Sequence, residues 1–191
     1  MKIIKSRLFK ILIVLFIFGF FMGFIYYYLS DNSGINDSII NYINLIDNDG
    51  YNYFNSFINS LFYNYSFEFI IWFSGICFIF SFVIPFLIIF KGISMGFIFT
   101  GIIYVFHIKG LLYALIILFP FIINSFIYIF TSYYSINYSI KCYKLYKSDK
   151  LISYKSLIKN YLYILLIFIG ILLISSLIEI FICSKLLTFV V

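Results

Sequence analysis

Few side chains in this sequence have the chemistry for catalysis or metal binding, and their spacing forms no known catalytic pattern. The sequence contains one histidine, His107, and no H-E-x-x-H, G-x-S-x-G or phosphate-binding glycine loop. Its three cysteines, Cys77, Cys142 and Cys183, have neither paired nor C-x-x-C spacing. We therefore expect no catalytic residue, no metal site and no cofactor, and we predict that the protein is not an enzyme.

Glu179 is a carboxylate within an apolar stretch near the C-terminus. About 18 residues of that stretch precede it, which puts it roughly 27 Å along a helix, close to a membrane border. A charge at that depth is costly without a partner, and His107, Lys109 and Lys185 are the candidate partners. A proton relay would need further buried acids, and the pattern indicates none.

Two prolines lie within other apolar stretches. Pro85 and Pro120 each remove a backbone donor, so each is expected to kink its helix. Asn124, one turn after Pro120, is expected to satisfy the carbonyl that the proline frees.

Glycines four residues apart occur twice, as Gly19 with Gly23 and as Gly92 with Gly96. Small residues at this spacing let two helix backbones approach closely in lipid. The pattern predicts packing within the chain, with homo-oligomerisation as the alternative.

The elements that position these residues are membrane helices. Hydrophobic residues form 64% and charged residues 10% of the 191 positions, which is more apolar surface than a soluble domain of this size can bury. We predict an all-α fold: a polytopic helix bundle in contact with membrane lipid, forming a single membrane domain over 1–191. Five transmembrane helices are expected, over residues 8–29, 67–90, 92–106, 111–133 and 161–183.

Lys91 is interpreted as a tight turn between the second and third of these helices. The third is short, since residues 92–106 rise only about 22 Å against a hydrocarbon core of about 30 Å. A re-entrant hairpin is the alternative, but it would leave Lys91 in mid-bilayer at a cost on the order of 3 kcal/mol. Two full crossings are therefore favoured.

The distribution of charge predicts the orientation. The N-terminus, the Lys91 turn and a basic loop over 134–160 share one side, which holds eleven of the thirteen basic residues. Six of the seven acids, Glu68 among them, fall on the other side or its border. The positive-inside rule makes the basic side cytoplasmic, with the C-terminus outside. Basic loops beside a membrane meet anionic lipid, so no nucleic-acid partner is expected.

The predicted outer loop, 30–66, contains an amphipathic helix over 54–65. Apolar residues recur at helical spacing on one side, and asparagines and serines fill the other. Such a helix rests in the headgroup region, docks an extracytoplasmic partner, or does both. The candidate docking residues are Phe54, Phe57, Ile58, Leu61, Phe62 and Tyr65.

Ordered landmarks over about 68–185 resemble the stage II sporulation protein M family, multi-pass membrane proteins of endospore-forming bacteria. K-G-x-x-x-G-F at 91–97 is similar to the family's turn into its third helix, and K-G-L-L at 109–112 to the start of its fourth. The amide pair that commonly follows the family proline is absent, since Phe121 and Ile122 stand there. The landmark residues are Trp72, Gly75, Pro85, Lys91, Gly92, Gly96, Lys109, Gly110, Pro120 and Glu179.

The resemblance implies a role in engulfment during endospore formation. It implies a non-catalytic membrane scaffold in a protein complex that remodels septal peptidoglycan, with the hydrolases known as sporulation proteins D and P as partners. Localisation would be the cell membrane, at the sporulation septum. The alternative is a small transporter or permease subunit of the same family outside sporulation, for which the proline-broken helices, Asn124 and Glu179 are the motivating features.

Overall fold

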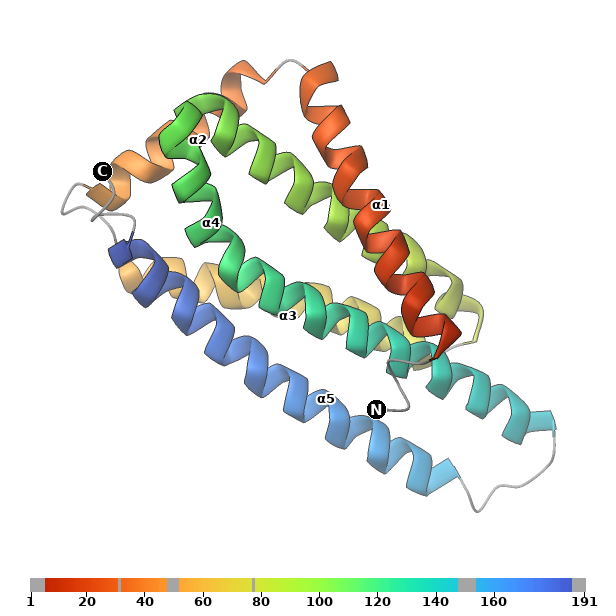
Figure 1. The fold of residues 1–191 in the computed structure, drawn as a ribbon. Coiled ribbons are helices and arrows are strands. Elements are labelled where there is room, and N and C mark those ends of the chain that lie inside the picture. The colour runs from red at the N-terminus through yellow and green to blue at the C-terminus, as the bar shows by residue number, and fades with distance from the viewer. Residues whose placement is uncertain (1–5, 31, 48–51, 77, 148–153, 187–191) are drawn as a thin grey trace.

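The computed structural model describes residues 6–30, 32–47, 52–76, 78–147 and 154–186, and these residues form helices and no strand (Figure 1). The helices are α1 (Arg7–Leu29), α2 (Ser33–Asp47), α3 (Tyr53–Ile76), the short 3₁₀ helix η1 (Ile79–Phe82), α4 (Val83–Lys147), α5 (Tyr154–Leu177) and the π-helix η3 (Ile178–Cys183). The all-α prediction is confirmed.

The number of predicted spans needs correction. Among the described residues, three helical stretches, not five, are long and apolar enough to cross a membrane: Arg7–Leu29, Ile79–Leu145 and Ser156–Leu186. The predicted span 67–90 does not form one helix, because α3 ends at Ile76 and the apolar residues after it belong to η1 and α4. The predicted spans 92–106 and 111–133 both lie in α4.

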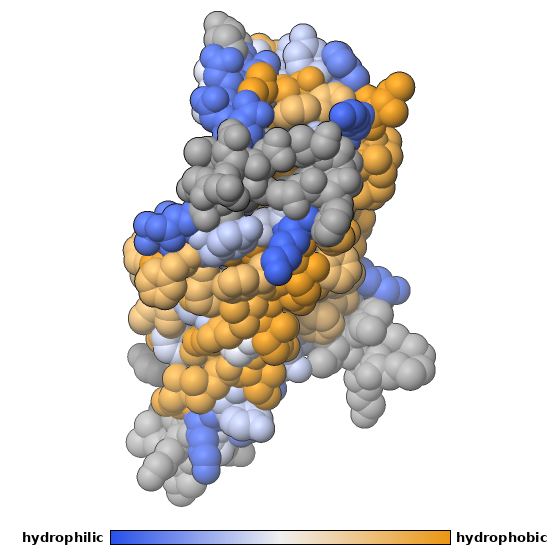
Figure 2. Space-filling model, turned by 90° about the vertical axis from the view of Figure 1, so that its left-hand side faces the viewer, coloured by the Kyte–Doolittle hydropathy of each residue, from blue (hydrophilic) through white to orange (hydrophobic). Residues whose placement is uncertain are grey.

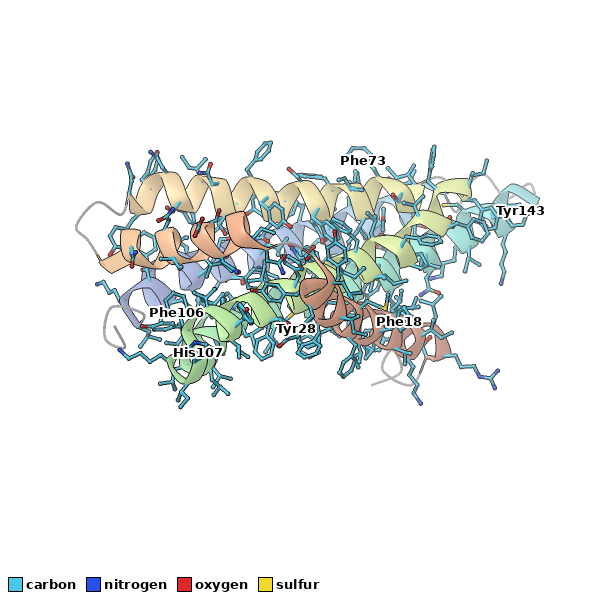
Figure 3. The ribbon with its side chains drawn as sticks, turned by 90° about the horizontal axis from the view of Figure 1, so that it is seen from above. Phe18, Tyr28, Phe73, Phe106, His107 and Tyr143 are labelled. Atoms are coloured by element: carbon cyan, nitrogen blue, oxygen red, sulfur yellow. The ribbon has the colours of Figure 1, made fainter. Side chains whose placement is uncertain are left out.

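α4 reverses direction at His107. This residue has φ 51° and ψ −121°, which is non-helical, and the segments before and after it run in nearly opposite directions (Figure 1). Figure 3 shows His107 at one end of the bundle and Tyr143 at the other. A Cβ on Gly110 would lie 2.5 Å from the Ile102 carbonyl oxygen, so the return of the chain requires a glycine there.

Lys91 does not mark a turn. It lies inside α4, and only 2% of its surface is exposed. The turn that the sequence pattern placed there occurs instead around 78–82. Pro85 is therefore in the first turn of α4, where a missing N–H costs no helical hydrogen bond, and it does not kink a helix interior.

The basic loop predicted over 134–160 is also mostly helical. α4 continues to Lys147 and α5 begins at Tyr154, which leaves 148–153 outside the described residues. The end of α4, the start of α5 and the start of α1 lie at the end of the bundle opposite to α2 and the bend of α4 (Figure 1).

Both glycine pairs lie where α1 crosses α4. A Cβ on Gly19 or Gly23 would collide with the backbone carbonyl oxygens of Ile89 and Ile93 in α4. In return, a Cβ on Gly92 or Gly96 would collide with backbone atoms of Phe16 and Phe20 in α1. The two helix backbones are therefore in direct contact, as small-residue motifs permit in lipid. Homo-oligomerisation remains a prediction.

Hydrophobic side chains cover much of the outer surface. Figure 2 shows one face on which they form a broad band, with hydrophilic residues gathered toward its two ends. Large apolar residues are exposed on α1 and α3, such as Phe18 at 54% and Phe73 at 60% (Figure 3). Exposure on this scale fits contact with lipid, and the chain is a membrane protein by this criterion.

Candidate functional site

Two polar residues of α3, Ser60 and Asn64, face the interior of the bundle. The predicted amphipathic helix 54–65 is the first half of this helix, and its apolar side was expected to rest in the headgroup region or to dock a partner. Asn64 is 5% exposed, whereas Phe54 and Phe62 are 68% and 75% exposed. In lipid the favourable arrangement is inverted, because polar groups find partners inside the bundle and apolar groups face hydrocarbon.

A hydrogen-bonded polar network joins α3, α4, α5 and η3. Ser60 Oγ donates to Glu179 Oε2 at 2.8 Å, and Asn64 Nδ2 donates to Ser60 Oγ at 3.3 Å. Asn64 Nδ2 also lies 3.4 Å from Ser176 Oγ, and Tyr128 OH donates to Asn64 Oδ1 at 2.9 Å. We call Ser60, Asn64, Tyr128, Ser176 and Glu179 the polar network.

Glu179 enters this network from a π-helix. The wider winding of η3 adds a residue to a helical turn, and such insertions occur frequently at functional sites. His107, Lys109 and Lys185 were the expected partners of this carboxylate, but its hydrogen bond and the charge that acts on it come from other residues. Its hydrogen bond comes from Ser60, and the positive charge that acts on it is Lys91.

The ammonium group of Lys91 lies within a cage of aromatic rings. Its Nζ is 4.5 Å from the ring centroid of Tyr63, 5.1 Å from Phe67, 5.9 Å from Phe121 and 5.0 Å from Tyr128. Among the described residues it has no hydrogen-bond partner. The aromatic cage therefore holds this charge by the electrostatic attraction between a cation and ring faces.

The balance of energies favours this burial. Placing an ammonium group in mid-membrane costs on the order of 3 kcal/mol on insertion scales. A desolvated cation–π contact contributes about 2 kcal/mol, and Lys91 has several together with the attraction of Glu179. These contacts are sufficient to offset the cost of burying the ammonium group. The prediction of a turn at Lys91 included that cost but none of these contacts.

Glu68 is a buried carboxylate, and only 1% of its surface is exposed. The sequence analysis placed it on the outer side or its border. Thr131 Oγ1 donates to its Oε1 at 2.7 Å, while Oε2 has no hydrogen-bond partner among the described residues. Asn124 Oδ1 is likewise buried without one. The bundle interior thus contains more ionisable and polar groups than the sequence pattern indicated.

Pro120 lies inside α4, where α5 and η3 pack against it. Its missing N–H leaves the carbonyl of Ile116 without the usual helical donor. Cys183 Sγ donates to that carbonyl at 3.4 Å, so the cysteine, rather than Asn124, satisfies it. Ser175 Oγ also lies 3.4 Å from the carbonyl oxygen of Pro120.

Trp72 and Gly75 lie where α3, α4 and α5 meet. The indole ring stacks on Tyr161, with centroids 5.6 Å apart, and the Tyr161 hydroxyl donates to the Trp72 carbonyl at 2.9 Å. A Cβ on Gly75 would lie 2.6 Å from both Ser135 Cβ and Tyr161 OH. These two landmark residues therefore serve helix packing. Lys109 is exposed beside the bend of α4.

The six candidate docking residues form two stripes on α3. Phe57, Leu61 and Tyr65 are partly buried, and Tyr65 OH donates to the Ile169 carbonyl of α5 at 3.3 Å. The other three are exposed and recur every four residues. We call them the outer stripe: Phe54, Ile58 and Phe62.

Comparison with known proteins identifies the family of this chain. The model of the stage II sporulation protein M family matches residues 12–184. The chain belongs to this family. No curated protein and no solved structure matches it. Within this stage II sporulation protein M domain, the landmark residue Lys91 is buried, and its positive charge acts on the landmark residue Glu179.

Proposed function

We propose that this protein is a non-catalytic membrane scaffold for remodelling septal peptidoglycan during engulfment in endospore formation. Membership of the stage II sporulation protein M family over residues 12–184 supports the link to sporulation. In this proposal the protein anchors and positions peptidoglycan hydrolases, the family's proteins D and P, which carry out the cutting. The complex would act at the sporulation septum.

The proposed orientation has the N-terminus in the cytoplasm and the C-terminus outside. Arg7, Lys10, Lys141 and Lys144 belong to the end of the bundle that includes the start of α1 and the end of α4. The positive-inside rule favours this end as the cytoplasmic one. α2 and the outer stripe on α3 then lie toward the outside, where peptidoglycan and its hydrolases are.

The outer stripe is the surface that we propose for partner docking. Its two phenylalanines are exposed, at 68% for Phe54 and 75% for Phe62. Exposed aromatic residues make large contributions to binding, often about 2 kcal/mol each. A hydrolase with a membrane-proximal apolar segment could pack against them without the protein changing its fold.

Replacing both phenylalanines of the outer stripe with alanine is expected to reduce hydrolase binding by tenfold or more, about 1.4 kcal/mol. The measurement is the amount of each hydrolase recovered when the tagged protein is purified in mild detergent from sporulating cells. Phe73→Ala is the matched control, since Phe73 is 60% exposed at the other end of the same helix. Recovery of neither hydrolase with the unsubstituted protein, together with normal engulfment after its deletion, would refute the scaffold proposal.

A second candidate function is ion or solute transport, and the buried side chains of Glu68 and Lys91, with the partly buried Glu179, favour it. Ionisable groups inside a membrane bundle often mark a transport path. Purified protein in liposomes that carry a pH-sensitive dye tests this candidate. Flux no greater than that of empty vesicles would exclude proton transport and leave the scaffold as the proposal.

A further inference from the structure

Two cavities meet at Glu179. One has a volume of about 340 Å³ and the other about 300 Å³, and both are lined by Phe121 and Glu179. Each is in the size range of small-molecule sites, about 300 to 1,000 Å³. We call the pair the double cavity. Its position between α2, α3, α4 and η3 is separate from the outer stripe.

The two halves of the double cavity differ in chemistry. The larger is lined mainly by isoleucines of α2 and α4, including Ile39, Ile102 and Ile117. The smaller is lined by hydrogen-bonding side chains of α3, among them Ser56 and Asn59. An occupant that satisfies both halves must therefore have an apolar part and a polar part.

The charges around the polar half indicate a neutral head. Glu179 is its only carboxylate among the described lining residues, and the buried ammonium of Lys91 acts on that carboxylate electrostatically. An ionised head would add a charge that no lining residue balances. Serine and asparagine side chains both donate and accept hydrogen bonds, as hydroxyl groups do.

The apolar half is accessible from outside the bundle. Ile35 and Ile98, which line it, are 40% and 37% exposed, so an acyl chain can enter between α2 and α4. α2 is held over this region by the hydrogen bond from Tyr27 OH to Asn36 Oδ1, at 2.7 Å.

We propose that the double cavity binds one lipid with a neutral, hydroxyl-bearing head, which occupies the polar half while an acyl chain occupies the apolar half. This inference goes beyond the proposed scaffold role and does not depend on it. In a bilayer, apolar packing alone does not favour one lipid over another, because every lipid offers hydrocarbon. Hydrogen bonds between the lipid head and Ser56, Asn59 and Ser60 must therefore provide the selectivity for one lipid over another.

Native mass spectrometry of the full-length protein tests the proposal. The protein is transferred from nanodiscs that contain equal amounts of glucosyl diacylglycerol and phosphatidylglycerol with the same acyl chains. We expect one glucosyl diacylglycerol to remain bound per chain. Its occupancy should exceed that of phosphatidylglycerol at least about tenfold, which corresponds to a difference in binding free energy of about 1.4 kcal/mol. Equal retention of the two lipids, or retention of neither, would overturn the proposal.

Two variants locate the bound lipid. Ile117→Trp fills the apolar half and is expected to lower occupancy about tenfold, whereas Leu115→Trp is the control, because Leu115 is 57% exposed on the same helix and does not line this half. Asn59→Leu is expected to reduce the preference between the two heads by a similar factor. Thermal unfolding of each variant shows whether it has folded. If folded Ile117→Trp retains the lipid as well as Leu115→Trp does, the lipid is bound elsewhere and the proposal is wrong.

Discussion

Lys91→Met is expected to destabilise the bundle by about 3 kcal/mol, although methionine fills nearly the same volume and prefers an apolar site. The reason is that Glu179 loses the positive charge that acts on it within the bundle. Removal of one partner of a buried pair leaves an uncompensated charge, whereas removal of both can be nearly neutral. Glu179→Gln in addition is therefore expected to recover about 1 to 2 kcal/mol of the loss.

The measurement is unfolding by SDS of protein in bicelles, followed by fluorescence of Trp72. This is the single tryptophan, and its partly buried ring stacks on Tyr161, so its emission reports the packing of α3 against α5. Lys109→Met is the control, because Lys109 is exposed and its replacement should change stability by less than about 0.5 kcal/mol. Strictly additive effects of the Lys91 and Glu179 substitutions would show that the two residues do not interact.

Gly96→Ala is expected to cost about 2 to 3 kcal/mol, which is a large effect for one methyl group. The new Cβ would overlap the backbone carbonyl oxygen of Phe20 in α1. A backbone atom cannot move aside by changing a rotamer, so α1 and α4 must separate and lose contacts along their crossing.

Gly170→Ala is the matched control for this prediction. A Cβ on Gly170 meets no heavy atom within 4 Å, and the residue lies in the interior of α5. Alanine is the better helix former, so this variant should be unchanged or more stable by up to about 1 kcal/mol. The same unfolding assay compares the two. Equal stability of the two variants would mean that the α1–α4 contact is not close.

The turn predicted at Lys91 is wrong because of the side chains that surround this residue in the fold. A lysine between two apolar stretches is ordinarily excluded from the bilayer, and this predicted a turn there. The structure supplies aromatic rings from α3 and from the second half of α4 to hold the charge. Those rings are distant in the sequence, so the cost of burial could not be calculated without the fold.

The inward-facing polar residues of α3 could not be predicted from the sequence either. The periodicity of residues 54–65 predicts an amphipathic helix, but periodicity does not indicate which surroundings each side faces. Ser60 and Asn64 point inward because their partners Glu179, Ser176 and Tyr128 come from other helices. Those partners are far from them along the chain. A soluble protein with this pattern would have placed the same residues outside.

Composition and ordered local motifs were sufficient to predict a helical membrane protein of the stage II sporulation protein M family, because they do not depend on contacts between distant residues. The reversal of α4 at His107 and the burial of Lys91 beside the polar network became evident only from the packing of the helices. Those outcomes depend on free energies of burial, which are set by partners on other helices.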